Sequence, residues 1–90
     1  MRRDVSAVLA QVAAERRSLK TEAKRIERER MTASHEVSRL VDAVSRAAGA
    51  AEDALMVKLA EVQGRVTAVE RRRRELADRE AALADQVIYA

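Results

Sequence analysis

Apolar residues recur at alternating intervals of three and four along almost the whole chain. In the first half they occupy a heptad position d, at Val5, Val12, Leu19, Ile26, Ala33, Leu40 and Ala47. A second position, a, holds Leu9, Arg16, Ala23, Arg30, Val37 and Val44. The repeat slips by one residue near Gly49 and resumes with Leu55, Val62, Val69, Leu76 and Leu83 at d, and with Leu59, Val66, Arg73, Glu80 and Val87 at a. Only an underwound helix keeps such a stripe facing a partner helix, so the repeat predicts an all-α coiled coil.

The slip decides between one long rod and a folded hairpin. It falls at Gly49, in a short Ala/Gly segment, and glycine is the residue favoured in the left-handed conformation just past a helix end. Arg46 precedes this segment, and Glu52 and Asp53 follow it, which matches the helix dipole at both ends. We therefore expect one domain over residues 1–90, an antiparallel two-helix coiled-coil hairpin. Helix 1 covers about 4–47, the turn about 48–51 and helix 2 about 52–88.

The register of the hairpin can be tested, because antiparallel partners must have position numbers with a constant sum. One register satisfies the core layers, and it pairs Val44 with Leu55, Val37 with Val62, and Ala23 with Leu76. In this register the flanking g positions place an acid on helix 1 opposite a base on helix 2, at Glu22 with Arg79, Glu29 with Arg72, and Glu36 with Arg65. Exposed ion pairs add little stability, but their consistent sign favours the antiparallel orientation.

Four charged residues interrupt the apolar seam at one height. Arg30 and Arg73 occupy a positions in neighbouring layers, and Glu27 and Glu70 each precede one of them by three residues. We expect an alternating cluster with its charges at the rim and the arginine stems over the core. Such polar core positions lower stability and raise the specificity of the register.

The composition excludes most chemistry. There is no cysteine, and the single histidine, His35, falls at an outward f position, so we predict no metal site and no cofactor. No serine has a basic partner in a plausible triad, and a two-helix rod has no deep pocket for a small molecule, so no enzyme activity is expected. No apolar stretch is long enough to span a membrane and no secretory signal follows Arg3, which makes a cytoplasmic protein the default.

One basic band lies midway along the predicted rod. The chain carries 18 basic and 15 acidic residues, and most of this charge is balanced along the helix faces. The exception is the run at 71–74, which lies level with basic residues of helix 1 and gives a weak nucleic-acid candidate at Lys24, Arg25, Arg28, Arg71 and Arg74. Glutamates share the band and no aromatic side chain is available to stack on bases, so phosphate contact is the less favoured interpretation.

The hairpin tip is the strongest candidate for a protein-binding surface. Apolar residues there occupy flanking and outward positions as well as the core, at Val41, Val44, Leu55, Met56 and Val57. Apolar groups clustered at one end of a charged rod usually indicate a partner protein, either a second copy or a similar coiled coil. Ordinary packing of the turn accounts for the same residues equally well.

The tip sequence resembles the coiled-coil insertion of large serine recombinases, the phage-type integrases. The likeness rests on VSRLVDAV at 37–44, the Ala/Gly turn, ALMVKLAE at 54–61, and an Arg/Glu-rich helix with Leu76 and Leu83; it covers roughly Gln11 to Leu83. In that family the hairpin lies within the zinc-ribbon DNA-binding region and joins recombinase subunits bound at different DNA sites. The resemblance implies a non-catalytic arm that contacts its partner through Val41, Val44, Leu55 and Met56, and meets DNA only through a parent protein. The catalytic serine domain and the zinc-binding cysteines of the family have no counterpart in this sequence.

Two other classes of function stay open. The chain is also consistent with a helical adaptor that self-associates into a four-helix bundle, and solution mass separates this from a monomeric arm. It is less similar to the tRNA-binding arm of seryl-tRNA synthetases. That interpretation predicts salt-dependent RNA binding that is lost when residues 71–74 are changed.

Overall fold

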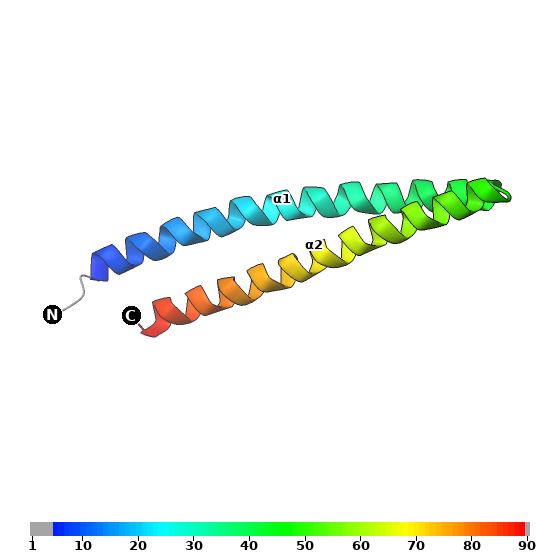
Figure 1. Cartoon of the computed structure of the whole chain (residues 1–90). Coiled ribbons are helices and arrows are strands. Elements are labelled where there is room, and N and C mark those ends of the chain that lie inside the picture. The colour runs from blue at the N-terminus through cyan, green and yellow to red at the C-terminus, as the bar shows by residue number, and fades with distance from the viewer. Residues whose placement is uncertain (1–4, 90) are drawn as a thin grey trace.

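The computed structural model describes the backbone of residues 5–89 and the side chains of residues 5–86. It contains helix α1, Val5–Arg46, and helix α2, Ala50–Tyr89, packed against each other as an antiparallel hairpin (Figure 1). The hairpin is a rod with extents of 71 × 16 × 15 Å. The predicted all-α helical hairpin is therefore confirmed.

A single glycine makes the reversal between the helices. Gly49 has a φ of 68°, the left-handed conformation that a side chain disfavours. The amide of Ala47 donates to the carbonyl of Val44 at 3.2 Å and closes α1, while the carbonyl of Gly49 accepts from the amide of Asp53 at 3.3 Å and opens α2. Because Gly49 takes part in both the reversal and the first turn of α2, this helix begins at Ala50, two residues before the predicted start.

The core of the rod is built almost entirely from d positions. Seven of its eight buried apolar residues belong to the d series and one, Leu59, belongs to the a series; the d-series members are Val12, Leu19, Ile26, Ala33, Val62, Val69 and Leu83. Ile26 is 2% exposed and Val62 is fully buried. Towards the open end, the d residues Val12, Leu19 and Leu83 of the two helices pack into one cluster, with Val8 and Leu76 against it.

The a positions are less buried than the heptad repeat predicted. Arg30, Val37 and Val44 are only half-buried, and Arg16, Arg73 and Glu80 are exposed. Charged side chains at a positions keep their end groups in water, whereas glutamates at g positions cover the core with their stems and pair across the helices. The two helices are therefore rotated so that their interface is centred on the d positions, and the a positions are less covered.

The open end of the rod also differs from the prediction. Val5 and Leu9 were expected in the core, but they are 55% and 46% exposed. The a-position residue Val87 lies outside the described side chains. The repeat continues to this end of α1, but burial requires side chains from the other helix at the same height.

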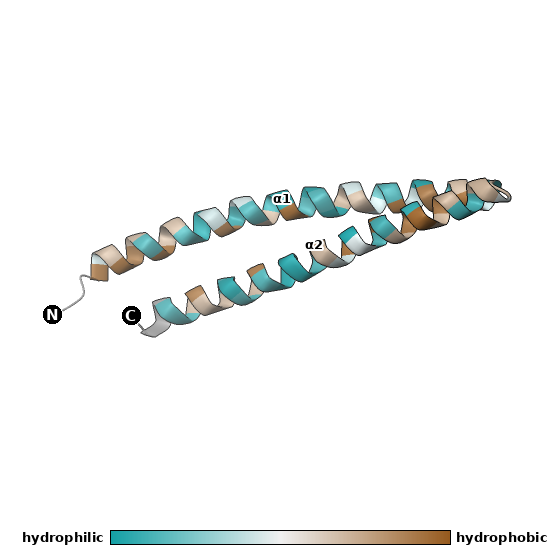
Figure 2. Ribbon diagram, in the orientation of Figure 1, coloured by the Kyte–Doolittle hydropathy of each residue, from teal (hydrophilic) through white to brown (hydrophobic). Residues whose placement is uncertain are grey.

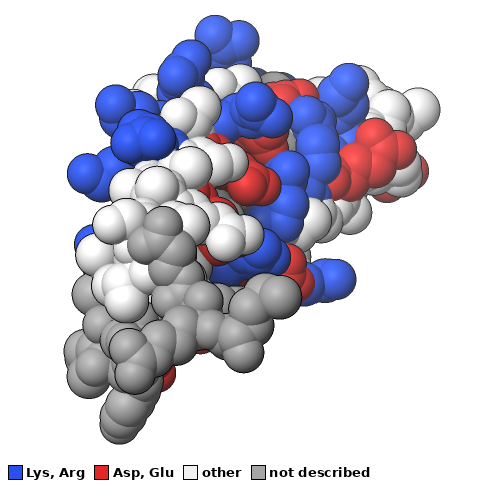
Figure 3. Space-filling model, turned by 90° about the vertical axis from the view of Figure 1, so that its left-hand side faces the viewer, with Lys and Arg blue, Asp and Glu red and all other residues white. Residues whose placement is uncertain are grey.

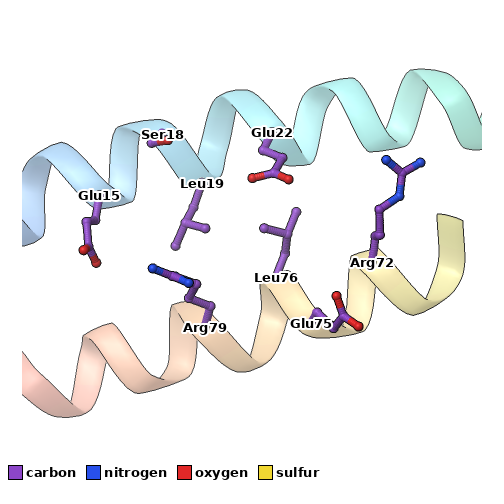
Figure 4. Close-up of a pocket in the computed structure, with 8 residues that line it drawn as sticks. All are labelled: Glu15, Ser18, Leu19, Glu22, Arg72, Glu75, Leu76 and Arg79. Atoms are coloured by element: carbon purple, nitrogen blue, oxygen red, sulfur yellow. The ribbon is translucent and has the colours of Figure 1, made fainter. Parts of the chain in front are cut away.

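Ion pairs between the helices confirm the predicted register. Arg65 donates to both carboxylate oxygens of Glu36 at 3.3 Å, and Arg72 pairs with Glu29 one heptad further along. The third predicted pair is not formed, because Glu22 and Arg79 make no hydrogen bond or ion pair with each other. In Figure 4 the guanidinium of Arg79 lies on the Glu15 side of Leu19, away from Glu22.

Candidate interaction surface

The rotated interface divides the long sides of the rod into two unlike surfaces. One side carries the g and c positions, with the ion pairs between Glu29 and Arg72 and between Glu36 and Arg65. The other side carries the a and e positions, and we call it the a/e flank. Its members are, on α1, Leu9, Ala13, Arg16, Lys20, Ala23, Glu27, Arg30, Ser34, Val37, Val41 and Val44, and, on α2, Met56, Leu59, Gln63, Val66, Glu70, Arg73, Ala77, Glu80 and Ala84.

The a/e flank is apolar at the end nearest the turn. Val41 is 50% exposed and Met56 is 49% exposed, both at e positions, and Val37 and Val44 beside them are half-buried. We call these four residues the tip patch. Figure 2 shows hydrophobic ribbon on both helices near the tip, in contrast to the hydrophilic middle of α2. Large apolar side chains left half in water on a rod of charged residues are typical of a surface that binds another protein.

The structure brings together four of the five predicted partner-binding residues. Val41, Val44 and Met56 lie on the a/e flank, and Leu55 is half-buried at the d position beneath them. Val57 is separate: it is 63% exposed at an f position, which points directly away from the other helix. The heptad repeat already placed Val57 at an outward position near the tip. It lies on the back of α2, away from the other four residues.

A charge cluster of Glu27, Arg30, Glu70 and Arg73 occupies the middle of the a/e flank. Arg30 donates through Nε to both carboxylate oxygens of Glu27 at 3.1 Å, and its Nη2 lies 2.5 Å from Oε1 of the same carboxylate. The hydrogen bond from Arg30 lowers the pKa of Glu27, partial desolvation opposes this, and the positive charge of Arg73 lowers it further. The pKa of Arg30 is raised by Glu27 and, more weakly, by Glu70. The predicted alternating cluster is thus present.

The five residues of the predicted basic band do not form one patch. Lys24, Arg25, Arg28, Arg71 and Arg74 are all exposed, at b, c and f positions of the two helices. Residues at f positions of antiparallel partners point to opposite sides of the rod, so Arg28 and Arg71 cannot contact one phosphate backbone from the same side. In a view along the rod from its open end, acidic side chains lie among basic ones in the centre and on the right, whereas the basic side chains at the upper left lie among uncharged residues (Figure 3). This arrangement is typical of a solvated coiled-coil surface.

One groove lies on the side opposite the a/e flank. It has a volume of about 510 Å³, and its floor is formed by Leu19 and Leu76 between charged walls that include Glu22, Arg72 and Arg79 (Figure 4). A second groove of about 450 Å³ lies over Ala33, Ala68 and Val69. Both are shallow furrows between two helices, open to solvent. The titratable groups that line them are exposed or half-buried. Ser18 lines the first groove and Thr32 the second, with no histidine among the lining residues of either.

The part of the chain that the structure describes has neither a metal-binding cluster nor a membrane-spanning helix. No group of three or more histidine, aspartate or glutamate side chains there is placed to hold a metal ion. Neither α1 nor the described length of α2 has an apolar stretch that could cross a bilayer.

Comparison with known proteins does not assign the chain to a family. No protein-family model, curated protein or solved structure matches the chain. The candidate surface therefore rests on the exposure, charge and helix positions described above.

Proposed function

We propose that this chain is a non-catalytic coiled-coil arm that binds another protein through the a/e flank. The observation that carries the proposal is the exposure of the tip patch, where Val41 and Met56 are each about half in water at one end of a rod rich in charged residues. In a two-helix hairpin these side chains have no third element to cover them. A helical partner that lies along the flank would remove them from water and gain the hydrophobic free energy of burial.

The resemblance to large serine recombinases gives this arm a biological setting. In that setting the arm would join recombinase subunits bound at different DNA sites, in the cytoplasm, and would contact DNA only through its parent protein. The tip patch supports this version because the likeness is strongest in the segments that carry it, 37–44 and 54–61. The exposed basic side chains favour an RNA-binding arm less, because they are spread around the rod.

Site-specific photocrosslinking in the source cells tests the proposal. A photoreactive phenylalanine analogue at Val41 should capture a protein, because this side chain lies within the proposed interface. The same analogue at Val57 is the matched control, since Val57 is equally close to the turn but points away from the flank. Capture of RNA, or of no macromolecule, at Val41 would contradict the proposal. Capture of a protein at both positions would show that the interface surrounds the whole tip and is not confined to the a/e flank.

A second experiment addresses the recombinase setting directly. In a parent recombinase, Val41→Glu with Met56→Glu should leave binding to single DNA sites unchanged and abolish the joining of two sites. Val57→Glu should leave both steps unchanged. Helicity measured by circular dichroism should be nearly the same in all variants, because none of these positions lies in the d-centred core. Normal joining by the double variant would refute the tip patch as the working surface.

A further inference from the structure

We propose that the partner of the a/e flank is a second copy of this chain, lying parallel to the first with the two tips side by side. This inference rests on the proposed function, because it names the partner of the same surface. The assembly would be a four-helix bundle in which each copy contributes one hairpin. The two copies would be related by a twofold axis along the rod.

The ion pairs between α1 and α2 show which residues of the two helices lie at the same height along the rod. The ion pairs of Glu29 with Arg72 and of Glu36 with Arg65 show which positions of α1 and α2 lie level with each other. A twofold axis along the rod brings α1 of one copy over α2 of the second copy at the same height. Each residue of the flank on α1 therefore meets the level residue of α2 in the second copy.

Opposite charges meet in this arrangement. Glu27 faces Arg73 of the second copy, and Arg30 faces Glu70 of the second copy. Within one hairpin the same two pairs already lie close enough to shift the pKa of Glu27 and of Arg30. In the charge cluster each helix carries one acid and one base, and each acid lies level with the base of the other helix. Rotation by the twofold axis therefore places every charge of one copy opposite an unlike charge of the second copy. Complementary charges of this kind set register and partner choice in coiled-coil assemblies.

Three more pairs of the flank match in the same register, whereas Arg16 faces Ala84, Val37 faces Gln63 and Ser34 faces Val66. Towards the tip, Val41 faces Leu59 of the second copy and Val44 faces Met56 of the second copy, so apolar groups meet apolar groups. Towards the open end Lys20 faces Glu80 of the second copy. All side chains of these three matching pairs except Val44 and Leu59 are exposed in the single hairpin, and Val44 is half-buried. The second copy would therefore cover what one copy leaves in water.

The antiparallel alternative matches poorly. A twofold axis across the rod can also pair Glu27 with Arg30 of the second copy, because both lie near the middle. That arrangement sets the open half of one rod against the tip half of the other. Lys20 then faces Val37 and Arg16 faces Val41, so two cations would be taken from water without a partner, which is unfavourable. With tip beside tip, Lys20 gains Glu80 and one cation, Arg16, has no opposite charge facing it. The charges along the flank therefore favour the parallel arrangement, in which the two tips lie side by side.

The flank is large enough for a stable dimer. A face 71 Å long and 16 Å wide has a footprint of roughly 1,100 Å², and a stable interface buries about 800 Å² on each partner. The tip patch would be the apolar end of this interface, and the charge cluster and the Lys20–Glu80 pair would form its polar part.

Two measurements on the full chain test the inference. Light scattering should give twice the chain mass of 10.0 kDa. The chain has no cysteine, so Ala51→Cys places one spin label per copy at an exposed site beside the turn. Pulsed electron resonance should then find the two labels about 20–30 Å apart, the width of a bundle of four helices. Labels separated by nearly the 71 Å length of the rod would overturn the parallel arrangement.

Variants locate the interface. Val41→Glu should weaken dimerisation by about tenfold or more, because it places a carboxylate in the apolar part of the interface. Val57→Glu is the matched control and should leave the dimer intact. An unaffected Val41→Glu dimer would overturn the flank as the interface. A monomer at every concentration would overturn self-association, while capture of a different protein at Val41 would leave the association arm in place.

Discussion

Arg65 on α2 bonds to both carboxylate oxygens of Glu36 on α1 at 3.3 Å, across 29 residues of sequence. This pair and the Glu29–Arg72 pair hold the same register one heptad apart. These ion pairs lie on the g side of the rod, and the a positions are less covered than the d positions. The a/e flank is thus the side of the rod opposite these two ion pairs.

Reversing either charge of this pair should lower stability slightly. Glu36→Lys or Arg65→Glu places like charges opposite each other, and the double exchange should restore the pair. Arg65 is exposed and Glu36 is half-buried at the edge of the interface, so a double-mutant cycle by urea unfolding should give a coupling free energy of about 0.2–1 kcal/mol. The coupling should shrink in high salt. Zero coupling at low salt would mean that the pair contributes nothing to the register.

The two glycines should respond in opposite directions to alanine. Gly49→Ala should lower the free energy of unfolding by about 1–2 kcal/mol, because a side chain there must adopt the left-handed conformation at a φ of 68°. Gly64→Ala should raise it by about 0.5–1 kcal/mol, since Gly64 lies within α2 and an added Cβ meets nothing within 4 Å. Thermal unfolding of both variants measures the difference. A stabilising Gly49→Ala would show that the turn has another conformation.

Truncation at the centre of the core should be much more costly than truncation on the surface. Ile26 is 2% exposed at a d position, and Ile26→Ala should lower the free energy of unfolding by about 2–5 kcal/mol. Val57→Ala removes an exposed side chain and should change it by less than about 0.5 kcal/mol. Equal effects in urea unfolding would mean that the d series does not form the core.

The charge cluster should make stability depend on pH. The folded-state pKa of Glu27 is below its ordinary value of 4.5, so its ionised carboxylate stabilises the fold above that pH. This contribution is lost as the pH falls through the lowered pKa. Carboxyl NMR titration should show the lowered pKa in the native chain and its return towards the ordinary value in Arg30→Leu. An unchanged pKa in Arg30→Leu would assign the shift to another group.

Replacing both arginines of the cluster with leucine should raise the melting temperature. Arg30→Leu with Arg73→Leu extends the apolar seam through the middle of the rod and removes the charges that specify register. We therefore also expect a mixture of oligomers, visible by light scattering. A large loss of stability with one unchanged oligomeric state would instead show that the cluster is a net stabiliser.

The heptad repeat and one glycine were sufficient to predict much of this molecule. They indicated two helices, an antiparallel turn at Gly49, the register, and the pairing of Glu29 with Arg72 and of Glu36 with Arg65. These features depend on spacing along the chain, and a helix converts spacing directly into direction. The apolar character of the tip patch could be predicted from the sequence for the same reason, since Val41 and Met56 fall at flanking positions of the repeat.

The rotation of each helix about its own axis was decided only by the tertiary structure. The repeat treats a and d as equivalent, but Arg16, Arg30, Arg73 and Glu80 at a positions favour water, whereas the g positions pair across the helices. The balance between these preferences is set by both helices together, and it leaves the a/e flank half-exposed. Sequence spacing therefore determined which residues share a face of this protein, and the packing of one helix on the other determined which face stays open to a partner.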